Sequence, residues 1–427
     1  MKLRILSLLL CAALLLTVCG CAGKAPAPGP APQSQAQKPP EGGKLPPAEM
    51  LAAVTAPDPS KTGEASAAAL DFAAALLRRT EGNNRLLSPL SILCALGMVL
   101  EGAEGETRSQ MEAALGVSGE TLRAFLGPWL SALAAEEAGA LHAADGIWIA
   151  DRPDLHVSED FLERNRTYYG AAVEQRPLDA AAVERINGFV KENTRGMIES
   201  LLDGLSPDAV MVLVNALAFE ADWETPYTED CVRPGVFRTE KGEEQEVSFL
   251  FSDEYTFLKD ENTTGFLKYY QGRRYAFAAL LPAEGLKPED YISSLSGEKL
   301  RKLLEGAKQT QVETVTPKFE TAFSVQLPDV LRSMGMTDAF DGLLADFSAL
   351  GSCDDGNIFI SQVIHKTFLK LDEKGTRAGA ATAVVMEALT ALREPPPRVV
   401  LDRPFVYLLL DTETNIPLFI GTVDSVG

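Results

Sequence analysis

The sequence predicts an α+β fold, with helices concentrated early in the chain and mainly antiparallel strands later. Near the start of the predicted folded region, apolar residues recur at helical spacing, as in Leu70, Phe72, Leu76 and Leu77. From about residue 235 onward, short alternating strands are separated by polar turns. No repeat and no regular βαβ alternation interrupts this order, and segregated helices and strands are typical of an α+β fold.

The further elements follow from local patterns. The run 210–219 is apolar except for Asn215 and predicts a central strand buried on both faces. Pro89 suits the first turn of a helix that follows a short strand. The other expected helices span residues 187–202, 288–306 and 327–334, and the other expected strands span 145–150, 247–251, 275–281, 311–319, 362–372, 405–410 and 418–423.

Composition limits the possible functions. The chain has 427 residues, 39 basic and 60 acidic, so its net charge is −21, which argues against nucleic-acid binding. Beyond the first 21 residues the cysteines are Cys94, Cys231 and Cys353, widely spaced and without a C-x-x-C pair. They indicate neither a disulfide framework nor a zinc site, and no metal or cofactor is expected.

The first twenty residues resemble a targeting segment. Lys2 and Arg4 precede the apolar run 5–18, and the following Cys19-Gly20-Cys21 completes a bacterial lipobox. We therefore expect a signal peptide at 1–20, a lipid on Cys21, a flexible Ala/Pro-rich stalk to residue 63, and one folded region at 64–427. An ordinary secretory signal is the alternative. The expected location is extracytoplasmic, on a bacterial membrane reached through the lipid anchor alone.

The segment from Glu373 to the three prolines at 395–397 has two interpretations. Its Ala, Met, Glu and Leu content favours a helix. Counted in twos, however, the even positions are uncharged and mostly small, whereas Arg377 and Glu387 share the other face. These even positions are Thr376, Ala378, Ala380, Thr382, Val384 and Met386. The pattern predicts a strand with one buriable side, exposed in one state and inserted in a sheet in another.

Several motifs, in order, resemble the serpin family over residues 64–427. They are Ser88-Pro89-Leu90-Ser91, Gly102-Ala103-x-Gly105-x-Thr107, Val214-Asn215 through Trp223, Pro317-Lys318-Phe319, Ala345-Asp346-Phe347-Ser348, His365-Lys366 leading to Asp372-Glu373-Lys374-Gly375-Thr376, and Arg403-Pro404-Phe405 with Phe419-Ile420-Gly421. The resemblance implies several helices around three mainly antiparallel sheets, with an exposed reactive loop. It also implies a monomer that inhibits a target serine protease: the cleaved loop inserts into the main sheet and traps the covalent acyl-enzyme.

The resemblance also implies site residues. Ser88, Ser91, Asn215 and His365 would form a polar cluster that regulates opening of the main sheet. Insertion would start near Trp223 and Glu373, and the loop hinge would comprise Gly375, Thr376, Arg377, Ala378, Gly379, Ala380, Ala381 and Thr382.

The scissile bond has two candidates. Forward spacing from Gly375 predicts Leu389-Thr390, which favours chymotrypsin-like or elastase-like targets. Backward spacing from Phe405 gives Arg393-Glu394 and a trypsin-like target instead.

Three other functions stay open. The chain could be a serpin-fold binding or surface module that inhibits nothing, or it could inhibit a cysteine protease. It could also be a hydrolase that uses Ser88 or Ser91 with His365, although no G-x-S-x-G surrounds either serine.

Overall fold

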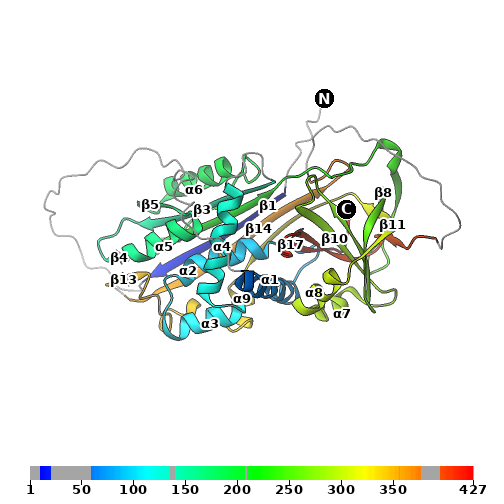
Figure 1. The fold of residues 1–427 in the computed structure, drawn as a ribbon. Helices are drawn as coiled ribbons and strands as arrows, with labels where there is room; N and C mark the ends of the chain where they lie inside the picture. Colours follow the sequence, from blue (N-terminus) through cyan, green and yellow to red (C-terminus); the bar gives the residue numbers. More distant parts are fainter. Residues whose placement is uncertain are drawn as a thin grey trace, which may run out of the picture.

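The computed structural model describes residues 10–20, 59–134, 140–206, 209–354, 356–376 and 395–426, and these ranges form three sheets with helices packed around them (Figure 1). The predicted α+β class with mainly antiparallel sheets is confirmed. Several predicted residues lie outside the described ranges: Cys21, the hinge residues 377–382, and both candidate bonds, Leu389-Thr390 and Arg393-Glu394.

The main sheet has six strands. In spatial order they are β12 (Phe319–Gln326), β14 (Ile358–Leu371), β1 (Leu10–Gly20), β6 (Ala209–Phe219), β3 (Leu141–Ala150) and β5 (Ala172–Arg176). Neighbours are antiparallel except β3 and β5, which are parallel.

A second sheet carries nine strands. Its path runs β15 (Arg398–Val400), β11 (Lys308–Pro317), β8 (Glu244–Lys259), β9 (Thr263–Tyr269), β10 (Tyr275–Pro282), β16 (Phe405–Asp411), β17 (Ile416–Val423) and β2 (Leu86–Leu87), and β7 (Val232–Arg238) pairs with β8. The short strands β4 (Leu155–Val157) and β13 (Gly351–Cys353) form the third sheet.

The helices are α1 (Pro59–Arg79), α2 (Pro89–Leu100), α3 (Gly105–Leu115), α4 (Gly119–Ala134), α5 (Glu159–Tyr169), α6 (Ala180–Asn193), α7 (Pro288–Ser293), α8 (Gly297–Glu305) and α9 (Pro328–Ser333). Helix α2 is buried along its whole length, and its N-cap is Ser88, whose side chain accepts a hydrogen bond from the Ser91 amide. It lies against β6, β1 and β17, so the main sheet and the second sheet meet at this helix.

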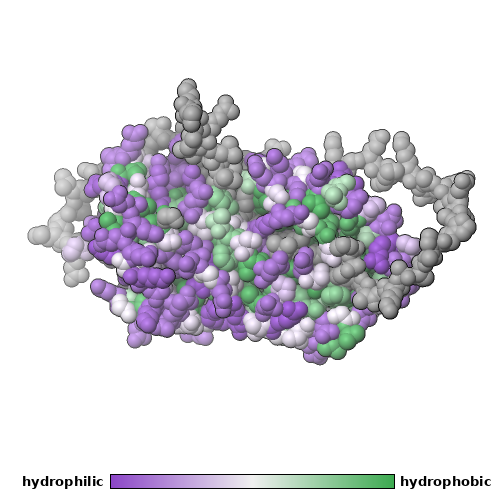
Figure 2. All heavy atoms as spheres, turned by 180° about the vertical axis from the view of Figure 1, so that it is seen from behind, coloured by the Kyte–Doolittle hydropathy of each residue, from purple (hydrophilic) through white to green (hydrophobic). Residues whose placement is uncertain are grey.

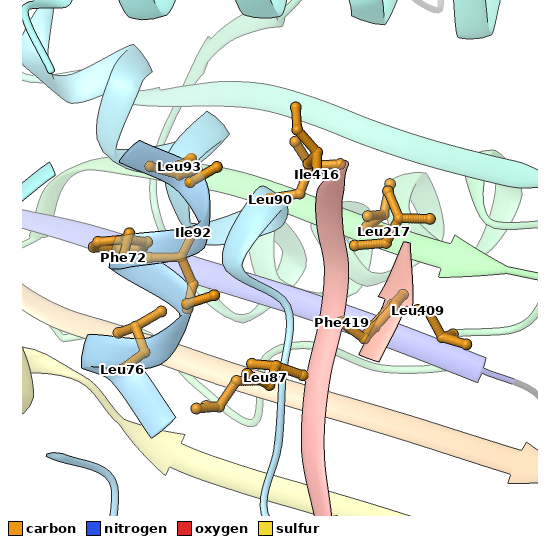
Figure 3. Close-up of a cluster of buried hydrophobic side chains, with 14 of the residues drawn as sticks. Phe72, Leu76, Leu87, Leu90, Ile92, Leu93, Leu217, Leu409, Ile416 and Phe419 are labelled. Carbon is orange, nitrogen blue, oxygen red and sulfur yellow. The ribbon is translucent and has the colours of Figure 1, made fainter. Parts of the chain in front are cut away.

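The principal core lies between these helices and the two large sheets. Figure 3 shows Phe72 of α1, Ile92 of α2, Leu217 of β6, Leu409 of β16 and Phe419 of β17 pointing into one cluster. Strand β6 is buried on both faces, as predicted. From Met211 onward its odd-numbered apolar residues belong to this core, whereas most of its even-numbered ones pack in a second core with α6.

Three expected helices have different boundaries. Helix α1 begins at Pro59, within the expected stalk, whereas folded structure was expected to begin near Glu64. The helix expected at 187–202 is α6, which begins after its N-cap Asp179 and ends at Asn193, because Arg195 and Gly196 adopt positive φ values of 52° and 77°. The helix expected at 288–306 is two helices, since Ser296 caps a new one with its own side chain.

Strand β1 was not predicted. The apolar segment read as a targeting sequence lies in the middle of the main sheet, paired with both β14 and β6 (Figure 1). Its interpretation as a signal peptide stays a prediction.

The face opposite to that of Figure 1 is mostly hydrophilic, with hydrophobic residues gathered toward its middle (Figure 2). This surface suits the net charge of −21. In the described ranges, no helix combines the length and the hydropathy needed to cross a membrane.

Candidate functional site

The chain leaves β14 through a tight turn that ends at the predicted hinge. The Asp372 amide donates to the Gly375 carbonyl over 3.1 Å, and Gly375 bridges Asp222, just beyond β6. Gly375 has a φ of +151°, and a Cβ here would overlap the Ala221 carbonyl oxygen. The next residue, Thr376, donates its amide to that carbonyl over 2.9 Å. The start of the hinge is therefore already paired with the continuation of β6.

Two aromatic side chains contact residues 372–376, which we call the hinge entry. The indole Nε1 of Trp223 donates to the Asp372 carbonyl over 3.0 Å, and its ring stacks on Tyr270 with centroids 4.3 Å apart. The Tyr270 hydroxyl lies 2.7 Å from Thr376 Oγ1, and Thr376 is only 1% exposed. Burial raises the pKa of Tyr270 far above its ordinary value, so its hydroxyl stays protonated.

A charged pair closes the outer side of the turn. Lys318 Nζ lies 2.8 Å from Glu373 Oε2, and the Tyr227 amide donates to the Glu373 carbonyl over 2.8 Å. Partial burial opposes ionisation of Glu373, but the Lys318 hydrogen bond and charge hold the pKa of this carboxyl below its ordinary value. The two predicted insertion-start residues, Trp223 and Glu373, thus lie at the same end of the main sheet.

A buried lysine lies beside Tyr227 at this end of the main sheet. Lys268 Nζ donates to Glu254 over 2.7 Å and to the Thr225 carbonyl over 3.2 Å, and it lies 4.3 Å from the ring centroid of Tyr227. Burial opposes its charge, but Tyr227 and Glu254 raise its pKa above the ordinary value. Neither Lys268 nor Tyr270 was predicted as a site residue, because nothing in the local pattern of residues 263–270 distinguishes a side chain at this site from one elsewhere.

The predicted polar cluster forms one hydrogen-bonded group near the middle of the sheet. The Ser88 amide donates to His365 Nε2 over 3.0 Å, which requires that this nitrogen be unprotonated. Ser91 Oγ donates to Asn215 Oδ1, and the Ser91 amide donates to Ser88 Oγ over 3.3 Å. All four side chains are at most 2% exposed. Helix α2 is thereby linked through hydrogen bonds to β6 and to β14.

Asp145 of β3 extends this cluster and was missed as a site residue. It is 8% exposed, pairs with Asn215 across the strands, and accepts a hydrogen bond from Asn215 Nδ2. Burial raises the pKa of Asp145 to about 7, although the Asn215 hydrogen bond opposes the shift. An acidic residue directly before the apolar run 146–150 was the available sequence signal.

The cluster does not have the geometry of a hydrolase. The Ser88 hydroxyl donates to the Leu418 carbonyl over 2.8 Å, and the Ser91 hydroxyl donates to Asn215. Since both hydroxyl protons are directed away from His365, neither serine is activated by it. In the described part of the chain, no group of three or more His, Cys, Asp and Glu side chains could hold a metal ion.

Asn215 of β6 and His365 of β14 face each other across the strand between them, and both pair with the same residue of β1, Leu14. The hinge entry at Thr376 and the polar cluster therefore lie along one strand position, which has β6 on one side and β14 on the other.

Comparison with known proteins identifies this architecture. The family profile described as Serpin (serine protease inhibitor) matches residues 64–426. The plasma serine protease inhibitor of Bos taurus is 31% identical over 363 residues, which cover 83% of this chain and 88% of that protein.

Solved structures agree with this assignment. The native state of the thermophilic serpin tengpin is similar with a TM-score of 0.79 and 38% identity, covering 87% of this chain and 96% of the other. Human thyroxine-binding globulin with thyroxine bound is similar with a TM-score of 0.75 and 27% identity, covering 86% and 99%. Serpins are generally protease inhibitors rather than enzymes, and this chain belongs to the serpin family.

Proposed function

We propose that this protein is a suicide-substrate inhibitor of serine proteases, with chymotrypsin-like or elastase-like enzymes as targets. After cleavage, the loop that begins at Gly375 would insert between β6 and β14 and trap the acyl-enzyme. The observation that carries the proposal is the hinge entry, because Thr376 is already hydrogen-bonded to Ala221 and buried against Tyr270 at one end of that strand position.

The pairing register supports insertion of the even-numbered face. Continued one residue at a time from the Thr376–Ala221 contact, an antiparallel strand puts Thr382 opposite Asn215. Asn215 faces α2 through Ser91, and directly paired residues of antiparallel strands point to the same side. The small, uncharged residues Ala378, Ala380 and Thr382 would then face the core, while Arg377 would face outward.

The length of the strand position supports cleavage after Leu389. With the one-residue shift that β6 and β14 each show near this end, loop residue 387 falls opposite Ala209, where β6 begins, and residue 388 falls opposite Ile358, where β14 begins. A loop cut after Leu389 would therefore fill the position completely. A loop cut after Arg393 would leave residues beyond the end of both flanking strands.

The driving force would be the completed sheet. A net gain of about 1 kcal/mol per hydrogen bond over some dozen inserted residues is on the order of 10 kcal/mol, before burial of the apolar face is included. The uncleaved protein cannot release this free energy, because its loop is still joined to β15 at the other end. Cleavage releases that constraint.

The test is to incubate the processed chain, beginning at residue 21 with Cys21→Ser, with elastase, chymotrypsin and trypsin in separate reactions. We expect a denaturant-stable complex with elastase or chymotrypsin and a released peptide beginning at Thr390. Leu389→Asp should abolish this complex, whereas the matched change Leu392→Asp should preserve it. A peptide beginning at Glu394 would move the specificity to Arg393. Cleavage by every enzyme without any complex would refute the inhibitory function and favour a binding role.

We further propose that the mature protein is tethered to a bacterial membrane by a lipid on Cys21. Support comes from the lipobox at residues 18–21 and the Ala/Pro-rich sequence that follows it. Labelled fatty acid should be incorporated into the native chain and lost in Cys21→Ala. Equal labelling of both chains would contradict the anchor.

A further inference from the structure

The strand position proposed for the cleaved loop is occupied in this structure by the chain's own N-terminal segment. Strand β1 pairs antiparallel with β6 from Leu10 to Cys19 and with β14 from Cys11 to Gly20. Both flanking strands are thus paired along nearly their full lengths, and the main sheet has six strands rather than five.

The register of β1 coincides with the register expected for the loop. On the β6 side, Leu10 pairs with Phe219, and continuation from the Thr376–Ala221 contact puts Ala378 opposite the same residue. On the β14 side, Cys11 pairs with Phe368, and continuation from the turn in which Asp372 bonds Gly375 puts Gly379 opposite Phe368. From Leu10 to Thr17 the two sides agree on one offset, in which residue n of β1 takes the place of loop residue n + 368; beyond Thr17 the pairing with each flanking strand shifts by one residue.

The composition of β1 suits this position. The segment reads LCAALLLTVCG and carries no charge, so its insertion into the buried centre of the sheet desolvates no ionised side chain. At the register position of Leu14 lie Asn215 and His365, and there the loop would supply Thr382. The even-numbered residues that the loop would insert, from Thr376 to Met386, are likewise uncharged.

The strand also ends where processing is expected. Strand β1 stops at Gly20, and the lipobox predicts cleavage between Gly20 and Cys21. Such a cut would separate residues 1–20, which include the whole strand, from the rest of the protein.

We propose that the position between β6 and β14 is a binding site for residues 10–20 of the unprocessed chain, and that this strand blocks insertion of the reactive loop. The two occupants exclude each other because each uses the same backbone groups of β6 and β14. Before processing, the covalent link gives the N-terminal segment an effective concentration on the order of millimolar. Removal of residues 1–20 would vacate the position and switch the inhibitor on. This inference rests on the proposed function, since only loop insertion gives the blockade a consequence.

The experiment compares two chains made without export: the unprocessed chain with Cys21→Ser, and the chain that begins at residue 21 with the same change. Backbone hydrogen exchange across residues 10–20 reports occupancy, and the rate of complex formation with elastase or chymotrypsin reports function. In the unprocessed chain, we expect exchange across residues 10–20 to be at least about 100-fold slower than in a free peptide of the same sequence. Complex formation by the unprocessed chain should be at least about tenfold slower than by the processed chain.

A charged variant distinguishes the effect of β1 in the sheet from the effect of merely having residues 1–20 attached. Leu14→Asp, at the centre of β1, should expel the strand and restore complex formation to the rate of the processed chain. The matched change Ile5→Asp, outside β1, should leave the block in place. An added synthetic peptide of residues 10–20 should slow the processed chain, and its Leu14→Asp version should not.

The outcomes distinguish the two proposals. If the processed chain forms no complex but residues 10–20 are protected in the unprocessed one, the inhibitory function fails and the binding site stands. If residues 10–20 exchange freely, or if both chains trap the protease equally fast, the blockade is refuted while the inhibitory function survives.

Discussion

The main sheet has two regions that hold the same strand position in different ways. At its entry, buried aromatic rings and one hydroxyl hold Thr376, with Tyr270 stacked on Trp223. In the middle, the Ser91 hydroxyl of α2 donates a hydrogen bond to Asn215 of β6, and the backbone amide of the N-cap Ser88 donates one to His365 of β14. The entry holds residues of the incoming strand itself, whereas the centre ties α2 to the two strands that flank the position.

This difference separates two kinds of control. Changes at the entry should alter how fast a strand begins to insert, because they act on residues of that strand. Changes at the centre should alter the stability of the sheet, because they act on its links to the helix. The polar centre also contains Asp145, whose charge changes near pH 7. At the entry, Tyr270 has a raised pKa and stays neutral, and Glu373 has a lowered pKa and stays ionised.

The largest expected effect is at the entry. Thr376→Arg would put a charge where the threonine is 1% exposed, so the hinge would have to leave its site. We expect complex formation to slow roughly 100-fold or more, with the protein cleaved as an ordinary substrate. Stopped-time denaturing gels measure the ratio of complex to cleaved chain. Lys374→Glu, on the exposed side of the same turn, is the control and should retain complex formation.

The next largest effect is expected at the polar cluster, where Asp145 should make the stability of the protein depend on pH. The pKa of Asp145 is about 7 in the folded protein, against about 3.9 in an unfolded chain. Because the folded state binds the proton more tightly, stability should fall as pH rises from about 4 to about 7 and then level off. Asp145→Asn should remove this slope and stabilise the protein at pH 8 by roughly 1 to 4 kcal/mol. Denaturant unfolding between pH 5 and pH 8 would test this, and an unchanged slope would contradict it.

A smaller effect is expected from the backbone of the turn. Gly375→Ala combines a positive φ with overlap of the Ala221 carbonyl, so we expect a loss of about 1 to 3 kcal/mol. Gly242 also has a positive φ, but a Cβ there would meet open space. Thermal unfolding should therefore show a larger loss for Gly375→Ala than for Gly242→Ala, and equal losses would exclude the overlap as the cause.

The smallest effect should come from the Lys318–Glu373 pair. Both side chains are about one-third exposed, at 34% and 37%, so solvent screens their attraction. A double-mutant cycle with Lys318→Met and Glu373→Gln should give a coupling energy below about 1 kcal/mol. A much larger coupling would mean that the pair also orders the turn, and the entry would then depend on charge as well as on aromatic packing.

Much of this architecture was predictable from local patterns. The apolar run around Asn215 predicted a doubly buried strand, and β6 confirms it, because a strand covered on both sides needs apolar residues at every position. The proline at position 89 marked the start of α2. Where prediction failed, as at the C-terminal end of α6, a left-handed turn at Arg195 and Gly196 ended a pattern that otherwise continued.

The sequence by itself determined the fold class, the strands that flank the insertion position and the alternating chemistry of the hinge, since side-chain periodicity depends only on neighbouring residues. Only the tertiary structure decided which distant residues meet. It brought Asp145 against Asn215, put Tyr270 on Thr376, and inserted residues 10–20 between β6 and β14. Strand pairing of this kind is non-local: any uncharged segment of suitable length satisfies the backbone, so the choice of partner is made by the open position in the sheet.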